Sequence, residues 1–153
     1  MVNFRVASEN DMKNLKSVSE PRISIDGESV VFVMSSNGSK NIWIASTKNG
    51  EIKQLTSGIG SDEVPRWSPD EKILGFVSNR YSKKHAYIDD WQIKTRSASK
   101  ENQIYILPMD SGESTKLTSV PNGIVKPRNL DAFVWSDDGR RIAFLSTDPF
   151  TQD

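Results

Sequence analysis

The sequence predicts an all-β fold, a partial β-propeller of four-stranded antiparallel blades that spans about two and a half blades and carries a short N-terminal helix. Two repeated segments indicate this fold. In the first, an apolar anchor and a serine precede an acidic turn and an apolar strand, in copies at 21–33, 65–77 and 133–145. In the second, a strand with a central aromatic residue leads through a glycine to Leu-Thr, in copies at 41–56 and 103–118. Ile23 and Trp67, at the same repeat position, lie about 44 residues apart, within the ~40–45 residues of one blade.

Turn residues separate short strands rich in Val, Ile, Phe, Trp and Tyr. In the first unit the turns are Asp26-Gly27, Asn37-Gly38 and Asn49-Gly50, residue pairs that supply the left-handed backbone of hairpin turns. In the second and third units the place of the first turn is taken by Pro69-Asp70-Glu71 and Asp138-Gly139. The alternation of strand and turn predicts a four-stranded meander from about residue 23 to about residue 56.

We expect one partial propeller domain over residues 1–153. Residues 1–20 are predicted to form a helix and a lead-in, with Ser8 as the N-cap of a helix over 8–15 and the acidic Glu9 and Asp11 near its positive end. The parts that follow are a blade at 21–60, a blade at 61–120 with an inserted loop at 80–102, and the start of a third blade at 128–153. The insertion replaces a tight turn, so we expect it to project from one rim of its blade.

The composition excludes several classes of site. The 153 residues include 20 Lys and Arg, 20 Asp and Glu, one His and no Cys. Without cysteine there is no disulfide, zinc-thiolate site or thiol nucleophile, and a net charge of zero argues against a nucleic-acid partner. The first residues lack the apolar stretch of a secretory signal, and no apolar run approaches the ~20 residues of a membrane span. We therefore expect a cytoplasmic protein with no membrane partner.

No catalytic pattern is present in the sequence. There is no Gly-x-Ser-x-Gly nucleophile elbow, and the Gly/Ser cluster at 57–61 is interpreted as a loop between blades. His85 could act as a base oriented by Asp89 or Asp90, or these three could begin a metal site. A solvated histidine is favoured, because there is no activated nucleophile and no full ligand set. We predict no catalytic, cofactor-binding or metal-binding residue in the chain.

The inserted loop mixes basic and aromatic side chains, a combination that can bind nucleic acid. They are Lys83, Lys84, Lys94, Arg96 and Lys100, with Tyr81, Tyr87 and Trp91. The zero net charge favours a solvated loop whose aromatic rings pack on the rim or against a partner. The aromatic residues at repeat positions are predicted to anchor the core rather than stack on a ligand; they are Trp43, Trp67, Tyr105 and Trp135.

The repeats resemble a known family. Trp67-Ser68-Pro69-Asp70 with 73–78, and 135–139 with 142–146, are similar to the WD40-like repeat shared by TolB-type propellers and prolyl-oligopeptidase-family serine peptidases. The closings Leu55-Thr56 and Leu117-Thr118 fit the same repeat. The start, from Leu15 through Pro21 into 23–27, resembles the beginning of acylaminoacyl-peptidase-like members. The resemblance covers residues 8–146.

The resemblance implies a function for the longer protein. In that family a propeller precedes an α/β-hydrolase domain with a Ser-Asp-His triad, covers the active site and restricts access to short peptides. The chain reaches Asp153 inside the expected third blade, and none of the family's catalytic residues falls on its positions. We therefore expect a fragment: the non-catalytic N-terminal part of a peptidase propeller, which gates access to the hydrolase domain. The alternative is a TolB-like protein-interaction module.

A propeller needs about four to eight blades to protect its edges. Two and a half blades leave apolar faces and strand edges uncovered. We expect these surfaces to meet the C-terminal part of the same protein, which is the favoured interpretation, or a second copy through open blade edges. Short peptides are the expected partners of the whole protein.

Overall fold

The computed structural model describes residues 16–58, 60–80, 101–128 and 130–147 of the chain. The described residues form strands, turns and loops and no helix, so this part of the chain contains no helix that could cross a membrane. The helix predicted over 8–15 and nearly all of the predicted insertion at 80–102 lie outside these residues.

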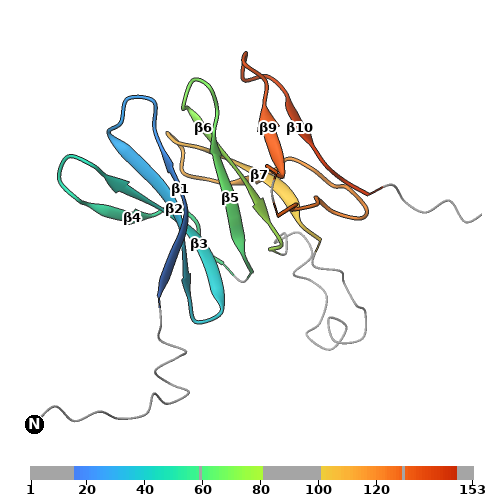
Figure 1. Cartoon of the computed structure of the whole chain (residues 1–153), viewed down its shortest axis with the longest axis horizontal. Helices are drawn as coiled ribbons and strands as arrows, with labels where there is room; N and C mark the ends of the chain where they lie inside the picture. The colour runs from blue at the N-terminus through green and yellow to red at the C-terminus, as the bar shows by residue number, and fades with distance from the viewer. Residues whose placement is uncertain (1–15, 59, 81–100, 129, 148–153) are drawn as a thin grey trace, which may run out of the picture.

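Three antiparallel sheets stand side by side like the blades of a fan (Figure 1). Blade 1 consists of β1 (Ser17–Ile23), β2 (Ser29–Ser36), β3 (Ser39–Ser46) and β4 (Ile52–Gln54). Blade 2 consists of β5 (Asp62–Trp67), β6 (Ile73–Ser78), β7 (Gln103–Pro108) and β8 (Thr115–Lys116). Blade 3 is represented by β9 (Phe133–Trp135) and β10 (Ile142–Phe144). Sequential order within each four-stranded sheet confirms the predicted meander. β1 begins at Ser17, which pairs with Ser35, four residues before the predicted start of the blade at 21.

The turn between the first two strands is built the same way in all three blades. A serine hydroxyl donates to the aspartate two residues later: Ser24 to Asp26 at 2.6 Å, Ser68 to Asp70 at 2.7 Å and Ser136 to Asp138 at 2.6 Å. These serine bonds, and a backbone amide that follows each aspartate, hold the pKa of each aspartate below its usual value. The sequence did not indicate that Glu71 adopts a left-handed φ of 57°, where the other blades have glycine.

The Leu-Thr closings fasten the end of each blade to its third strand. The Thr56 hydroxyl accepts a hydrogen bond of 2.9 Å from the Ile42 amide, and the Thr118 hydroxyl accepts one of 2.9 Å from the Ile104 amide. The leucine amides before them donate to the carbonyl oxygens of the same two isoleucines. Since Ile42 and Ile104 are fully buried, each threonine satisfies an amide that water cannot reach.

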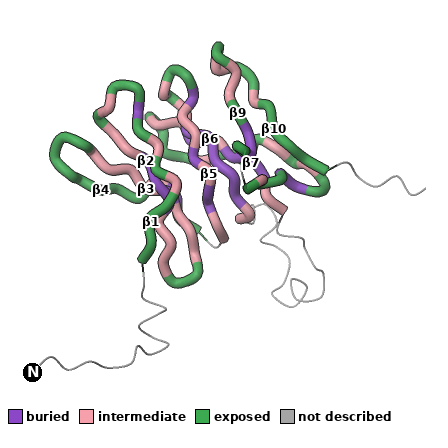
Figure 2. The backbone as a smooth tube through the Cα atoms, in the orientation of Figure 1, coloured by how far each residue is buried: buried purple, intermediate pink, exposed green. Residues whose placement is uncertain are grey.

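Apolar cores fill the two junctions between blades, where Figure 2 shows most of the buried backbone. The junction of blades 1 and 2 contains Val31, Val33, Ile42, Leu74, Phe76, Tyr105 and Leu107, with Trp67 packed against it. The junction of blades 2 and 3 contains Val77, Ile104, Ile124, Ala132 and Phe133, with Trp135 packed against it. Each tryptophan also donates across its junction: Trp67 to the Arg22 carbonyl at 3.3 Å and Trp135 to the Arg66 carbonyl at 3.2 Å.

Three of the four predicted aromatic anchors therefore lie in or against the two cores. The prediction was wrong for Trp43, which is half-buried and belongs to neither core. The reason is the alternation of side chains along a strand: Ile42 and Ile44 face blade 2, so Trp43 faces the opposite side of its blade and pairs there with Phe32.

Replacing Thr118 with valine removes the hydroxyl at nearly constant volume and leaves the buried Ile104 amide without an acceptor. We expect Thr118→Val to lower the free energy of unfolding by about 1–3 kcal/mol, measured by urea denaturation. Thr118→Ser keeps the hydroxyl and serves as the control, with a smaller loss. A smaller loss for Thr118→Val than for Thr118→Ser would show that the methyl group, which valine keeps and serine lacks, matters more than the hydrogen bond.

Gly75 of β6 faces the Phe133 ring across the junction of blades 2 and 3. A Cβ at this position would lie 2.9 Å from Phe133 Cε2, and 3.2 Å from Trp135 Cζ2. We expect Gly75→Ala to destabilise the chain by about 1–3 kcal/mol through overpacking, measured by thermal and urea denaturation. Replacing the ring by a smaller side chain, with Phe133→Leu in the same chain, should make Gly75→Ala less destabilising than it is alone. A Gly75→Ala chain more stable than the parent would contradict this description of the junction.

Candidate functional site

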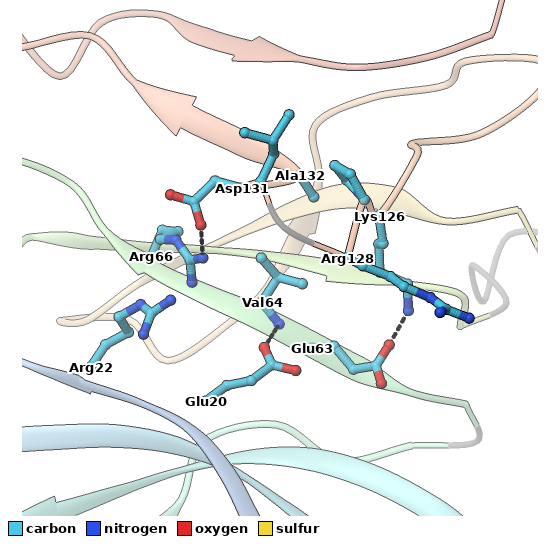
Figure 3. A pocket seen from close by; sticks show the side chains of 11 residues that line it. Glu20, Arg22, Glu63, Val64, Arg66, Lys126, Arg128, Asp131 and Ala132 are labelled. Carbon is cyan, nitrogen blue, oxygen red and sulfur yellow. Dashed lines mark hydrogen bonds and ion pairs between the residues drawn. The ribbon is translucent and has the colours of Figure 1, made fainter.

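The first strands of blades 1 and 2, and the segment that leads to β9, surround an open hollow of about 740 Å³ (Figure 3). Charged side chains dominate its lining: Glu20, Arg22, Glu63, Arg66, Lys126, Arg128 and Asp131. The volume lies within the ~300–1,000 Å³ that is usual for ligand sites. This inner-strand face is the candidate functional site.

A β-bulge shapes the floor of the hollow in both complete blades. The register shifts between Ser19 and Arg22 in β1 and between Glu63 and Arg66 in β5. At matching positions in the two bulges, Glu20 and Val64 have φ values of 54° and 57°. A left-handed conformation costs a β-branched residue roughly 1–2 kcal/mol. The Val64 amide donates to the Glu20 carboxylate at 2.6 Å, so one bulge fastens the other and both side chains line the hollow.

Glu63 ties three parts of the chain together at one end of the hollow. Its side chain is only 10% exposed and forms ion pairs with Lys40 of β3 and with Lys126 of the segment before β9. Burial opposes ionisation of this carboxylate, but hydrogen bonds and charges from Lys126 and Lys40 outweigh burial and hold its pKa below the usual value. Glu63 is therefore a charged link between blade 1, blade 2 and the chain entering blade 3.

The other end of the hollow carries two arginines at the same repeat position. One guanidinium nitrogen of Arg22 donates to the Pro21 carbonyl at 3.0 Å, and one of Arg66 donates to the Pro65 carbonyl at 2.8 Å. Arg66 also forms an ion pair with Asp131. The hydrogen bond from Arg66, and the charges of Arg66 and Arg22, hold the pKa of Asp131 below its usual value.

A second polar cluster lies at the end of blade 2 from which the predicted insertion leaves. Arg80 binds Asp62 through two hydrogen bonds of 2.8 and 3.2 Å and donates to Ser114 at 3.0 Å. Its guanidinium carbon lies 5.0 Å from the ring centres of both Phe76 and Tyr105, and burial raises the pKa of Tyr105. These contacts hold the Arg80 side chain, which is 17% exposed, against blade 2.

The residues considered as candidate acids, bases and ligands in the sequence fall elsewhere. His85, Asp89 and Asp90, and the basic and aromatic residues at 81–100, lie outside the described residues. Within the described residues, no group of three or more His, Asp or Glu side chains could hold a metal ion. The described part of 57–61 connects β4 to β5, the place expected for a loop between blades.

Sequence reasoning missed the inner-strand face. The available signal was the recurrence of Pro-Arg at 21–22 and 65–66, because equal positions in successive repeats come to lie side by side on neighbouring blades. Lys126, Arg128 and Asp131 carried no such signal, since they lie outside the repeated segments. Only the path of the chain into blade 3 brings them to the hollow.

A second hollow, of about 400 Å³, lies between blade 2 and β10. Its lining is mainly apolar and includes Ile106, Leu117 and Phe144. On the opposite side of the molecule, blade 1 exposes Ile23 to 63% and Ile25 to 80%. Blade 3 exposes Phe144 of β10 to 39%, so both outer blades carry apolar side chains that the described residues leave uncovered.

Comparison with known proteins agrees with this architecture. No protein-family model matches the sequence. The chain is 31% identical over 144 residues to the uncharacterized peptidase YuxL of Bacillus subtilis, an alignment that covers 90% of the chain and 18% of YuxL. It is 35% identical over 147 residues to a TolB homologue of Chlorobium chlorochromatii, covering 80% of the chain and 32% of that protein. The chain thus spans less than a third of the length of either relative.

Two solved structures show the same fold. The putative TolB of Agrobacterium tumefaciens matches 92% of the chain, and 42% of its own length, with a TM-score of 0.62 and 22% identity. An acylaminoacyl peptidase in complex with Z-Gly-Gly-Phe-chloromethyl ketone matches 88% of the chain and 18% of its own length, with a TM-score of 0.53 and 20% identity. The chain has the fold of a partial β-propeller. The resemblance to TolB propellers and to prolyl-oligopeptidase-family peptidases, acylaminoacyl peptidase among them, is confirmed.

The lowered pKa of Glu63 makes a prediction about the pH dependence of this propeller. A carboxylate whose pKa is lower in the folded than in the unfolded chain stabilises the fold above its unfolded pKa, and this stabilisation is lost as the pH falls through the folded pKa. Glu63→Gln should therefore be less stable than the parent at pH 7, and the difference should shrink between about pH 5 and about pH 3. Urea denaturation of both chains across this range measures it. A difference that stays constant with pH would mean that the ion pairs to Lys40 and Lys126 contribute nothing.

Proposed function

We propose that this chain is the N-terminal part of the propeller of a serine peptidase similar to acylaminoacyl peptidase and prolyl oligopeptidase. In this proposal the chain is not catalytic itself and gates the access of short peptides to a separate α/β-hydrolase domain. The observation that carries the proposal is the 31% identity to the peptidase YuxL over 90% of the chain. The bond-breaking residues belong to the rest of that protein.

The inner-strand face supports a gating role by its construction. Its ion pairs connect different blades: Glu63 pairs with Lys40 and Lys126, and Arg66 pairs with Asp131. Side chains held by partners on neighbouring elements form a wall of fixed shape and charge pattern. We propose that this wall admits an extended peptide of a few residues and excludes a folded chain, which is the selection that a gate must make.

A TolB-like interaction module is the second candidate, and one observation favours it. The TolB homologue of Chlorobium chlorochromatii is 35% identical over 80% of the chain. In this alternative the propeller surface contacts a protein partner and serves no hydrolase domain. Under both proposals the apolar ends, with Ile23 and Ile25 on blade 1, are covered by further blades of the same protein or by a second copy.

The native size and reactivity of the protein separate these two functions. An antibody against this chain identifies the native polypeptide in its source cells, and a fluorophosphonate probe labels any activated serine in it. The peptidase proposal expects a labelled band several times larger than 17.2 kDa. It also expects the purified native protein to hydrolyse acylated di- to tetrapeptides far faster than chains of about thirty residues. A band that carries no label would contradict the peptidase proposal and favour the TolB-like interaction module.

A further inference from the structure

Arg22 and Arg66 present a matched pair of guanidinium groups at one end of the hollow. They occupy the same position in successive repeats, on β1 and β5, and each uses one nitrogen to hold the carbonyl of the preceding proline. Figure 3 shows the two groups next to one another beneath Asp131, while Arg128 lies at the opposite end of the hollow. A guanidinium carries five N–H donors, so most donors of Arg22 remain available.

The two carboxylates at this end have partners other than Arg22. Asp131 is the acidic partner of Arg66, and within the described residues Arg22 forms no ion pair. The Glu20 carboxylate accepts a hydrogen bond from the Val64 amide. In the third repeat the matching residue is Val134, so blade 3 adds no further arginine. Glu20 and Asp131 thus balance the two positive charges, and Arg22 is the member of the pair whose donors no described carboxylate holds, in a partly buried place.

We propose that Arg22 and Arg66 bind one carboxylate group of a peptide. A planar carboxylate accepts two parallel N–H bonds from a guanidinium, and such charge-assisted bonds are among the strong ones. The nearby Asp131 and Glu20 would repel a doubly charged phosphate, so a singly charged anion fits better. That the carrier is a peptide rests on the proposed function; the carboxylate is either its C-terminus or an Asp or Glu side chain.

The test uses the 153-residue chain and three probes that share a backbone. N-acetyl-trialanine has a free C-terminal carboxylate, N-acetyl-trialanine amide has none, and N-acetyl-Ala-Glu-Ala amide has only a side-chain carboxylate. Binding is followed by nitrogen-15 NMR, with the Trp67 indole as reporter because it donates to the Arg22 carbonyl. At least one carboxylate probe should bind about tenfold or more tightly than the amide, and which one binds identifies the source of the carboxylate.

Two variants of equal charge decide whether Arg22 makes the contact. Arg22→Gln should weaken binding about tenfold or more, whereas Lys53→Gln, on exposed β4 and outside the hollow, should change it about twofold or less because salt screens a distant charge. Near-ultraviolet circular dichroism checks that both variants stay folded. Equal affinity for all three probes, equal weakening by the two variants, or tighter binding of inorganic phosphate would overturn the proposal. The binding test does not depend on hydrolysis. A chain that binds no carboxylate probe would therefore not contradict the proposed peptidase function, and a native protein without peptidase activity would not contradict the carboxylate site.

Discussion

A four-stranded blade has two apolar faces, and it can bury each of them only against a neighbouring blade. This constraint organises the whole chain. Within the described residues, both clusters of buried apolar side chains lie at junctions, and each junction adds one indole hydrogen bond, from Trp67 to Arg22 or from Trp135 to Arg66. Because these bonds end on the backbone of the inner strands, the packing of the blades also fixes the spacing of the strands that carry the charged hollow.

The hollow is thus a product of repetition and of its interruption. Repetition places Arg22 beside Arg66 and gives β1 and β5 the same bulge, with Glu20 and Val64 in left-handed conformations. The interruption comes from the longer path into blade 3, which brings Lys126 and Asp131 to the same place. The result combines a regular scaffold with an irregular charge pattern, the usual arrangement by which one fold serves many sites.

The all-β fold, the meander order and most turns could be predicted from the sequence. The reason is that turn residues such as Asp26-Gly27 and closings such as Leu55-Thr56 recur at equivalent positions in successive repeats. Glu71 shows where such reasoning ends: a tertiary fit overrides the preference for glycine at a left-handed residue. Trp43 shows another limit, because a repeat position does not reveal whether a neighbouring blade covers it. The hollow could not be predicted, since Lys126 and Asp131 are distant in sequence from their partners Glu63 and Arg66.

Position 23 lacks the tryptophan that its repeat equivalents, Trp67 and Trp135, use to bond the neighbouring blade. Where blades 2 and 3 have tryptophan, blade 1 has Ile23, whose side chain has no N–H group to donate. The side chain at position 23 can therefore contribute to contacts on that side of blade 1 only through dispersion and water exclusion, forces that have no preferred direction. The other two junctions must break a directed bond to move. A contact on this face of blade 1 therefore lacks the directed indole bond that each of the two described junctions has.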